Sequence, residues 1–272
     1  MSAGGVAVDA PRHSEVSRAT VFVALLWRDL FVTGREFWVF LAQVAIQPLF
    51  MLFVFAKVLG ELSFVSAQYS QVLLPGIVAL TAFLTALQTV ALPLVIEFGW
   101  TKEIEDRLLA PIPTPLVAVE KLVIAALRAL AASLLMIPIG ALILDQIPWR
   151  TSGLPLLLLL VLALGGWAGG SIGLILGTSV PPTRINIMFA LILTPLLFTG
   201  ATQYPWPLLD RLPWFKVVTA FNPLTYVSEG VRAAMAPGIP HIAPWISVTV
   251  LAVAGTVLTA IGMRGFRRRA ID

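Results

Sequence analysis

The sequence predicts an all-α integral membrane protein. It would have six transmembrane helices, an N-terminal amphipathic helix in the membrane interface and a re-entrant outer helical segment between the fifth and sixth spans. Hydrophobic residues make up 58% of the chain and charged residues only 12%, whereas soluble domains carry about 25% charged residues. Uncharged segments long enough to cross a bilayer recur along the chain. With no cysteine, disulfides and thiolate chemistry are excluded.

Residues 14–36 are expected to form the interfacial helix. Arg12 and Arg18 precede a short apolar run, as in a secretory signal, but Arg28 and Asp29 interrupt it and no small-x-small cleavage pattern follows. An amphipathic helix lying in the headgroup region and leading into the first span fits this pattern better.

Six segments have the length and polarity of membrane spans, since about 20 apolar residues cross the hydrocarbon core. They are residues 37–56, 72–96, 122–144, 153–180, 185–203 and 244–263. The chain is read as a single membrane domain, residues 1–272. With the N-terminus inside, twelve Lys and Arg residues fall on the inner side and five on the outer side. The positive-inside rule therefore predicts that both termini are cytoplasmic.

Residues 204–243, between the last two spans, are rich in Pro and Trp. The segment is moderately apolar yet too broken to cross, which predicts short helices that dip in and return. Glu229 and Arg232 are three residues apart and can pair on one helix face. A local structural pair and a gate on the outer side are both open interpretations.

The fourth span carries Gly165, Gly169, Gly173 and Gly177 at four-residue spacing. Such a stripe lets another helix backbone approach closely, so it predicts helix packing. Polar residues also share helix faces. They lie on the second span at Thr81, Thr85, Gln88 and Thr89, and on the first span at Gln43 and Gln47. These residues either line a substrate path or bond between helices. Arg128, one turn inside the third span, can extend to the inner surface.

The charged loop, Glu97–Lys121, holds eight of the 32 charged residues (18 basic and 14 acidic) and links the second and third spans on the predicted inner side. Pro111, Pro113 and Pro115 forbid a continuous helix. A stiff loop of mixed charge favours docking with a protein partner over a passive connection.

The sequence lacks the residues needed for intramembrane hydrolysis, metal catalysis or ATP binding. The only histidines, His13 and His241, lie outside the expected spans, and no span pairs carboxylates or places Ser beside His. No G-x-x-x-x-G-K-[ST] phosphate loop occurs. If ATP drives this protein, another chain must bind it. The basic residues lie mainly at span edges, which argues against nucleic acid.

The stretch "YSQVLLPGIVALTAFLTALQTVALPLVIEFGWTKEIEDRLLAPIPTPLVAVEK" resembles the membrane subunits of ABC type-2 exporters, particularly the daunorubicin-resistance-like permeases. In that family an "LLPGI" segment opens the second span and an acidic "E-x-R-L-L-x-x-P-I" loop follows it. "WRDLFVTGREFWVFLAQVAIQPLFMLFVF" and "FNPLTYVSEGVRAAM" are similar to its N-terminal helix and its signature before the last span. The match covers nearly the whole chain. "KEIEDR" departs from the family, which often has a glycine before the arginine.

The resemblance implies half of a homodimeric, or otherwise paired, permease in a bacterial plasma membrane that exports an amphipathic or lipid-like compound. It implies two copies of a separate ABC ATPase, which would hold ATP and Mg; this chain would bind no cofactor or metal, and its other partner would be membrane lipid. The implied ATPase-docking residues are Arg28, Glu97, Glu103, Glu105, Arg107, Pro111 and Pro113. Those of a translocation path are Gln43, Gln47, Thr81, Thr85, Gln88, Thr89, Thr194 and Phe198. Those of an outer gate are Asn222, Pro223, Tyr226, Glu229 and Arg232.

Four other functions compete with that of an ABC exporter permease. A polysaccharide or glycolipid exporter of the same superfamily remains open. A secondary transporter or channel is disfavoured because no carboxylate or histidine lies at mid-membrane and no inverted repeat is evident. An intramembrane enzyme lacks catalytic groups. A structural or assembly factor is a further alternative. A neighbouring gene for a protein with a phosphate loop would support the exporter over it, and a lone gene would weaken the exporter interpretation.

Overall fold

A computed structural model describes residues 22–24, 26–29, 31, 37–64, 66, 69–101, 113–144 and 155–271. Throughout these ranges the regular structure is helical, in agreement with the all-α prediction. The elements are α2 (Phe37–Leu52), the π-helix η1 (Phe53–Val58), α3 (Leu59–Glu61), α4 (Tyr69–Ile96), the π-helical turn η2 (Glu97–Thr101), α6 (Thr114–Ile143), α7 (Pro155–Ser179), the 3-10 turn η3 (Pro182–Arg184), α8 (Ile185–Thr199), the 3-10 helix η4 (Trp206–Arg211), α9 (Pro213–Ala220), α10 (Pro223–Met235) and α11 (Pro244–Ile271).

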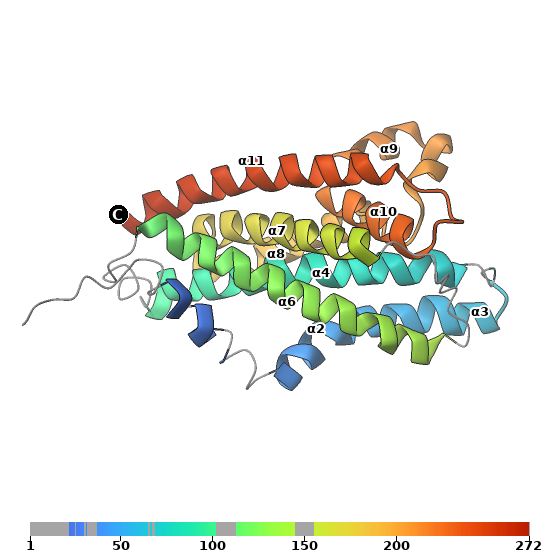
Figure 1. The fold of residues 1–272 in the computed structure, drawn as a ribbon, viewed down its shortest axis with the longest axis horizontal. Helices are drawn as coiled ribbons and strands as arrows, with labels where there is room; N and C mark the ends of the chain where they lie inside the picture. Colours follow the sequence, from blue (N-terminus) through green and yellow to red (C-terminus); the bar gives the residue numbers. More distant parts are fainter. Residues whose placement is uncertain are drawn as a thin grey trace, which may run out of the picture.

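Helix α4 is the centre of an elongated bundle (Figure 1). It packs against α7, α6 and α10, while α7 also carries α11 on its other side. Of the most apolar stretch of α4, 78% is buried inside the chain, against 22% for α11. The remaining face of α11 is therefore available to lipid or to another chain.

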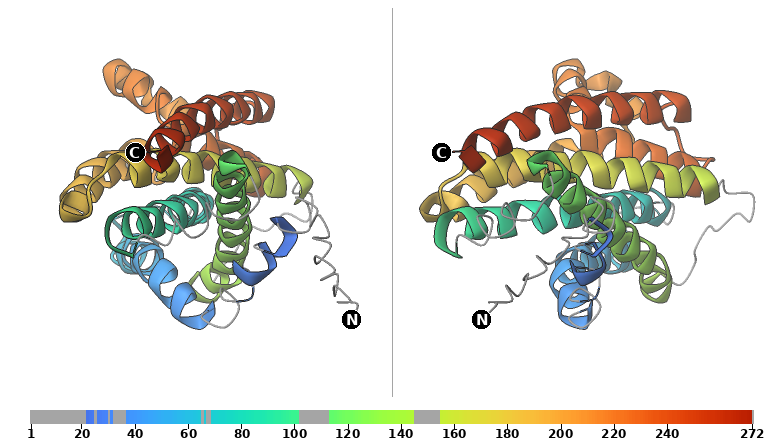
Figure 2. Two further views of the ribbon diagram at one scale, coloured as in Figure 1. Left: turned by 90° about the vertical axis from the view of Figure 1, so that its left-hand side faces the viewer. Right: turned by 60° about the vertical axis from the view of Figure 1, so that its left-hand side comes forward.

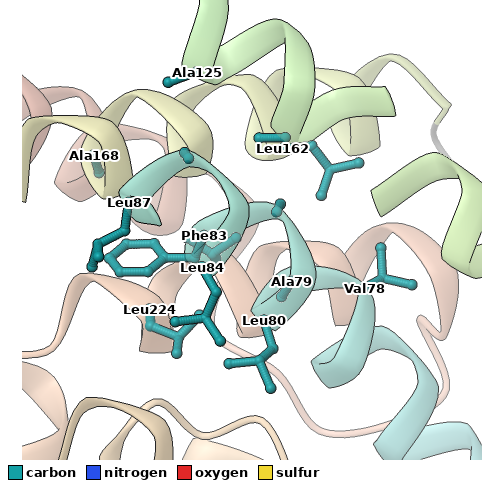
Figure 3. Packing of buried hydrophobic residues seen from close by; sticks show 14 of the residues in the cluster. Val78, Ala79, Leu80, Phe83, Leu84, Leu87, Ala125, Leu162, Ala168 and Leu224 are labelled. Atoms are coloured by element: carbon teal, nitrogen blue, oxygen red, sulfur yellow. The ribbon is translucent and has the colours of Figure 1, made fainter. Parts of the chain in front are cut away.

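The core lies around the middle of α4 (Figure 3). Phe83 and Leu87 of α4 are fully buried in one cluster with Ala168 of α7 and Leu224 of α10. The glycine stripe of α7 makes this closeness possible. A Cβ added at Gly169 would lie 2.5 Å from the carbonyl oxygen of Phe83. The predicted packing role of the stripe is confirmed.

Four helical segments are long and apolar enough to cross a membrane: Tyr69–Gly99, Pro115–Ile143, Pro155–Ser179 and Pro244–Arg269. Helix α8 has 15 residues and so extends only about 22 Å. From residue 37 to residue 61 the chain is helical but passes from α2 through a π-helical stretch. The count of six crossings, which needs α2 and α8, remains a prediction.

Some helix ends differ from the predicted ones. Helix α6 begins at Thr114, ahead of the predicted span at residues 122–144 and close to the helix start expected at Leu116, because Pro113 and Pro115 suit a first turn that needs no amide hydrogen-bond donors. Helix α8 ends at Thr199, not at residue 203, because the chain turns at Ala201, whose φ is +50°. Helix α11 continues to Ile271, since its terminal arginines favour helix.

The bundle has two distinct ends. At one lie η2, η3 and the C-terminal part of α11, and we call it the C-terminal end (Figure 1). At the other lie η4, α9, the end of α10 and the start of α11. Both views in Figure 2 show α9 at the periphery, away from α4. The short helices η4, α9 and α10 agree with the helical character predicted for the re-entrant segment.

Candidate functional site

Two polar clusters stand out, one at each end of the bundle. We call the first the junction: Glu97, Phe98 and Gly99, where α4 passes into η2, with the residues that they contact. We call the second the hub: Thr199–Thr202, η4, α9, α10 and the loop from α10 to α11. Each joins elements that are far apart in the sequence.

The junction contains a buried ion pair. Lys121 Nζ of α6 donates to Glu97 Oε1 over 2.9 Å, and each side chain is only 9% exposed. Since α6 begins at Thr114, Lys121 lies two turns inside the helix, where it meets the end of α4. The pair therefore ties together the two ends of the charged loop.

The next two residues contact other parts of the chain. The Phe98 ring meets the Phe266 ring of α11 edge-on, with centroids 5.6 Å apart, and Arg269 lies 5.1 Å from its centroid. A Cβ on Gly99 would lie 1.9 Å from the Pro182 side chain of η3. Only glycine permits this approach. The start of the charged loop is thus held by α6, α11 and η3 together.

Arg269 also caps a neighbouring helix. Its Nη1 donates to the carbonyl oxygen of Thr178 over 2.9 Å at the end of α7. The last carbonyls of a helix lack partners within it, and a cation there is favourable. Arg269 therefore links α7 and α11 to the ring of Phe98.

A cavity of about 200 Å³ opens beside the Glu97–Lys121 pair. Its walls combine charged and apolar side chains from the N-terminal helical residues, α4 and α6: Arg28, Asp29, Thr89, Pro93, Glu97, Lys121, Ile124 and Arg128. Arg128, predicted to extend to a surface, faces this cavity. Arg28, predicted for ATPase docking, and Thr89, predicted for the translocation path, both line this cavity.

At the hub, Asn222 caps α10. Its Oδ1 accepts from the amide of Leu224 over 2.9 Å, and Pro223 follows at the first helical position. Its Nδ2 donates to the carbonyl oxygen of Leu196 and to Thr199 Oγ1, at 2.8 and 2.9 Å. One side chain thus starts α10 and fastens it to the end of α8.

Glu229 and Arg232 form an ion pair that is completely buried. Glu229 Oε1 accepts from Arg232 Nη1 and from the amide of Trp206, and its Oε2 accepts from the amide of Ile242. Arg232 Nη2 donates to the carbonyl oxygen of Ala201 over 3.0 Å. Burial lowers the pKa of Arg232 and the Glu229 carboxylate opposes this shift, but a guanidinium stays charged.

Hydroxyl groups complete the hub. Ser228 donates to the carbonyl oxygen of Gly200 and Thr225 to that of Thr219, at 2.8 and 2.7 Å. Tyr226 donates to the carbonyl oxygen of Ala220, and Tyr204 to that of Phe198. Burial raises the pKa of Tyr204 to about 12, so its hydroxyl remains a donor near neutral pH. All five residues predicted for an outer gate therefore belong to one hydrogen-bonded body.

The residues predicted for a translocation path do not gather in one place. Thr81 and Thr85 are each 1% exposed, so they do not reach a path on the surface of this chain. Thr81 donates to the carbonyl oxygen of Ile77 in its own helix. Gln88 and Thr89 are half-buried. Exposed members are Gln47 on α2, and Thr194 and Phe198 on α8. The side chain of Gln43 lies outside the described residues.

The docking residues are described only in part. Glu103, Glu105, Arg107 and Pro111 lie outside the described residues. Pro113 is exposed at the start of α6, and Arg28 is exposed as well. Glu97 is 7% exposed and paired with Lys121, because α6 packs against it. Its expected docking role stays a prediction.

Sequence reasoning missed other members of both clusters. The contacts of η2 come from residues far away in the sequence, namely Lys121, Phe266 and Arg269. No local periodicity relates these residues to Glu97 and Phe98. Trp206 and Ile242 take part through backbone amides, which any residue offers. Among the described residues, no three His, Cys, Asp or Glu side chains gather as metal ligands.

A comparison with protein families gives one relationship. The sequence model of the ABC-2 type transporter family matches residues 20–236. A comparison with curated proteins gives no match. The matched region includes both clusters apart from the part of the α10–α11 loop after residue 236, Phe266 and Arg269, and it covers well over half of the chain. The helical membrane fold and this match together show that the chain belongs to the ABC-2 type transporter family and is a membrane component of such a transporter.

Proposed function

We propose that this chain is the permease subunit of an ATP-driven exporter that moves an amphipathic or lipid-like compound outward across a bacterial plasma membrane. The observation that carries the proposal is the family match over residues 20–236, in a chain that has no phosphate loop of its own. A transporter of this kind requires a separate ATPase, which binds ATP and Mg.

The part of the charged loop between Glu97 and Lys121, without these two end residues, is the proposed docking site for this ATPase. The C-terminal end of the bundle, where the loop starts, also carries Arg184, Arg264, Arg267 and Arg268, all exposed. Excess positive charge supports a cytoplasmic location for this end. Two ATPase copies that close on ATP would pull on the loops of two permease subunits, and their rigid bodies would rock relative to one another.

The exposed polar residues support a second permease copy. Gln47 is exposed on α2, and Thr194 on α8, among exposed apolar neighbours such as Ile46 and Leu191. Lipid tails offer an amide no hydrogen bond, so a Gln47 side chain facing hydrocarbon is unfavourable. A homodimer with its path between the copies, lined by α2, α4 and α8, gives these groups polar neighbours.

The test is to purify the tagged chain from its native membranes and to measure vanadate-sensitive ATP hydrolysis of the complex, with mass spectrometry of its partner. We expect a partner with a phosphate loop. Arg107→Glu should lower the co-purified ATPase by at least about tenfold, since charge reversal at an interface costs several kcal/mol. Replacing Pro111 and Pro113 together by glycine should also lower it, because the loop loses stiffness.

Arg150→Glu, a charge reversal in the loop between α6 and α7, is the matched control and should leave the ATPase bound. Unchanged ATPase binding in both loop variants would contradict the docking role. Transport by the purified chain alone in vesicles, driven by an ion gradient, would contradict the ATP-driven proposal.

A further inference from the structure

The Glu97–Lys121 pair lies at the base of the charged loop, where the loop joins α4 and α6 of the bundle. The two residues are 24 positions apart and close the loop at its base through a 2.9 Å contact. Both side chains are buried. An ion pair at this depth is screened far less than one at the surface. The end of α4 and the start of α6 therefore move together as long as the pair is intact.

The same base is attached to the rest of the bundle. Phe98 contacts Phe266 and Arg269 of α11, and Gly99 meets Pro182 of η3. A displacement of the loop thus reaches the central helix at a point that is fixed on three sides. Since the bundle is close-packed, it transmits the displacement as movement of whole helices rather than absorbing it locally.

Helix α4 connects this base to the hub. A Cβ on Gly76, near the opposite end of α4, would lie 1.7 Å from the carbonyl oxygen of Thr202. The two backbones are therefore in direct contact. Gly76 and Glu97 are 21 residues apart, which corresponds to about 32 Å along a helix. One buried helix spans the distance between the junction and the hub.

Features of the junction also favour a second arrangement of the Glu97 side chain. In the described part of the chain, the buried Oε2 of Glu97 has no hydrogen-bond partner, and such a group is unfavourable. The adjacent cavity, whose wall includes Arg28 and Arg128, gives the carboxylate room to re-pair. The π-helical turn that starts at Glu97 is a local irregularity of the kind often found at functional sites.

We propose that Glu97 and Lys121 are positioning residues for energy coupling: their pair joins the charged loop to α4, and α4 carries the displacement to the hub through the Gly76–Thr202 contact. This inference rests on the proposed function. It assigns to Glu97 a role inside the bundle in place of direct contact with the ATPase.

The experiment measures a conformational change at the hub in variants of the junction. Because the chain has no cysteine, Arg211→Cys on η4, which is exposed, gives a single reporter. Its rate of labelling by a maleimide is measured in the complex with the co-purified ATPase, reconstituted in lipid nanodiscs, with and without Mg-ATP and vanadate. We expect nucleotide to change the rate by at least about fivefold, the lower end for coupled sites.

Glu97→Gln keeps the side-chain length and Lys121→Gln shortens it by one atom, and both remove the ion pair. Both should retain the bound ATPase and lose the nucleotide response of the reporter. The exchange Glu97→Lys with Lys121→Glu should restore the response in part. Lys57→Gln, in the exposed Lys57–Glu61 pair, is the matched control and should respond normally.

A full nucleotide response in Glu97→Gln and Lys121→Gln overturns the inference. Loss of ATPase binding in these two variants also overturns it, because it would make them docking residues. Failure of the proposed function gives a different result: the reporter chain with an intact pair would bind no ATPase or show no nucleotide response.

Discussion

Ala201 takes a backbone conformation, φ +50°, that a non-glycine residue rarely adopts. Its carbonyl oxygen accepts from Arg232, and the carbonyl of its neighbour Gly200 accepts from Ser228. Such a conformation persists only where surrounding contacts determine it. The buried pair of Glu229 and Arg232 supplies those contacts, so the turn after α8 depends on charges located about 30 residues further along the chain.

Removal of Arg232 is the sharpest residue-scale prediction. Arg232→Met should destabilise the protein by about 3–5 kcal/mol, because it leaves the buried Glu229 carboxylate without its cation. Glu229→Gln should cost a similar amount, because it leaves the buried Arg232 guanidinium without its anion and replaces one acceptor oxygen by an NH2 group that faces N–H donors. The measurement is the thermal unfolding of the purified chain in detergent. Arg211→Met, at an exposed arginine of η4, is the control; equal midpoints for Arg232→Met and Arg211→Met would refute the structural role.

At the scale of the element, α7 shows how one helix can use glycine in two ways. Added Cβ atoms at Gly169 and Gly173 would lie 2.5 and 2.4 Å from carbonyl oxygens of α4. At Gly170, on another face, the nearest atoms are side-chain carbons of α6 at 3.3 Å. Backbone cannot move aside without moving its helix, whereas side chains can adjust.

Substitutions on α7 should therefore differ by face. Gly169→Ala and Gly173→Ala should each destabilise the bundle by about 1–3 kcal/mol through overpacking. Gly170→Ala should be near neutral, because better helix propensity, worth up to about 1 kcal/mol, offsets the tighter contact. The same thermal unfolding assay compares them. A loss for Gly170→Ala as large as that for Gly169→Ala would show that the α4–α7 backbone contact is not the determining feature.

At the scale of the whole molecule, charge and packing separate the two ends. The C-terminal end carries exposed arginines from η3 and α11. At the other end, the charges of Glu229 and Arg232 are buried inside the hub. The first end is suited to contact with water and a soluble partner, and the second is closed by its own hydrogen bonds.

This asymmetry predicts the orientation in the membrane. Arg268→Cys, near the end of α11, should be protected from a membrane-impermeant thiol reagent in intact cells and become reactive after lysis. Arg211→Cys should react in intact cells, where an outer membrane, if present, is made permeable. Since the native chain has no cysteine, each signal comes from one position. Labelling of Arg268→Cys before lysis would reverse the orientation and place the charged loop out of reach of a cytoplasmic ATPase.

The sequence by itself determined the features that depend on local pattern. Apolar length predicted helices, and the four-residue spacing of Gly169 and Gly173 predicted a close helix contact. The spacing of Glu229 and Arg232 likewise predicted a pair, since residues three apart share a helix face.

Only the tertiary structure decided which distant residues meet. Nothing in the spacing of Glu97 and Lys121 indicates an ion pair, and nothing in it indicates that both side chains are buried. The backbone contact of Gly76 with Thr202 and the capping of α7 by Arg269 are of the same kind. The physical reason is that helix periodicity fixes which face a side chain occupies, whereas the packing of one helix on another fixes what that face touches.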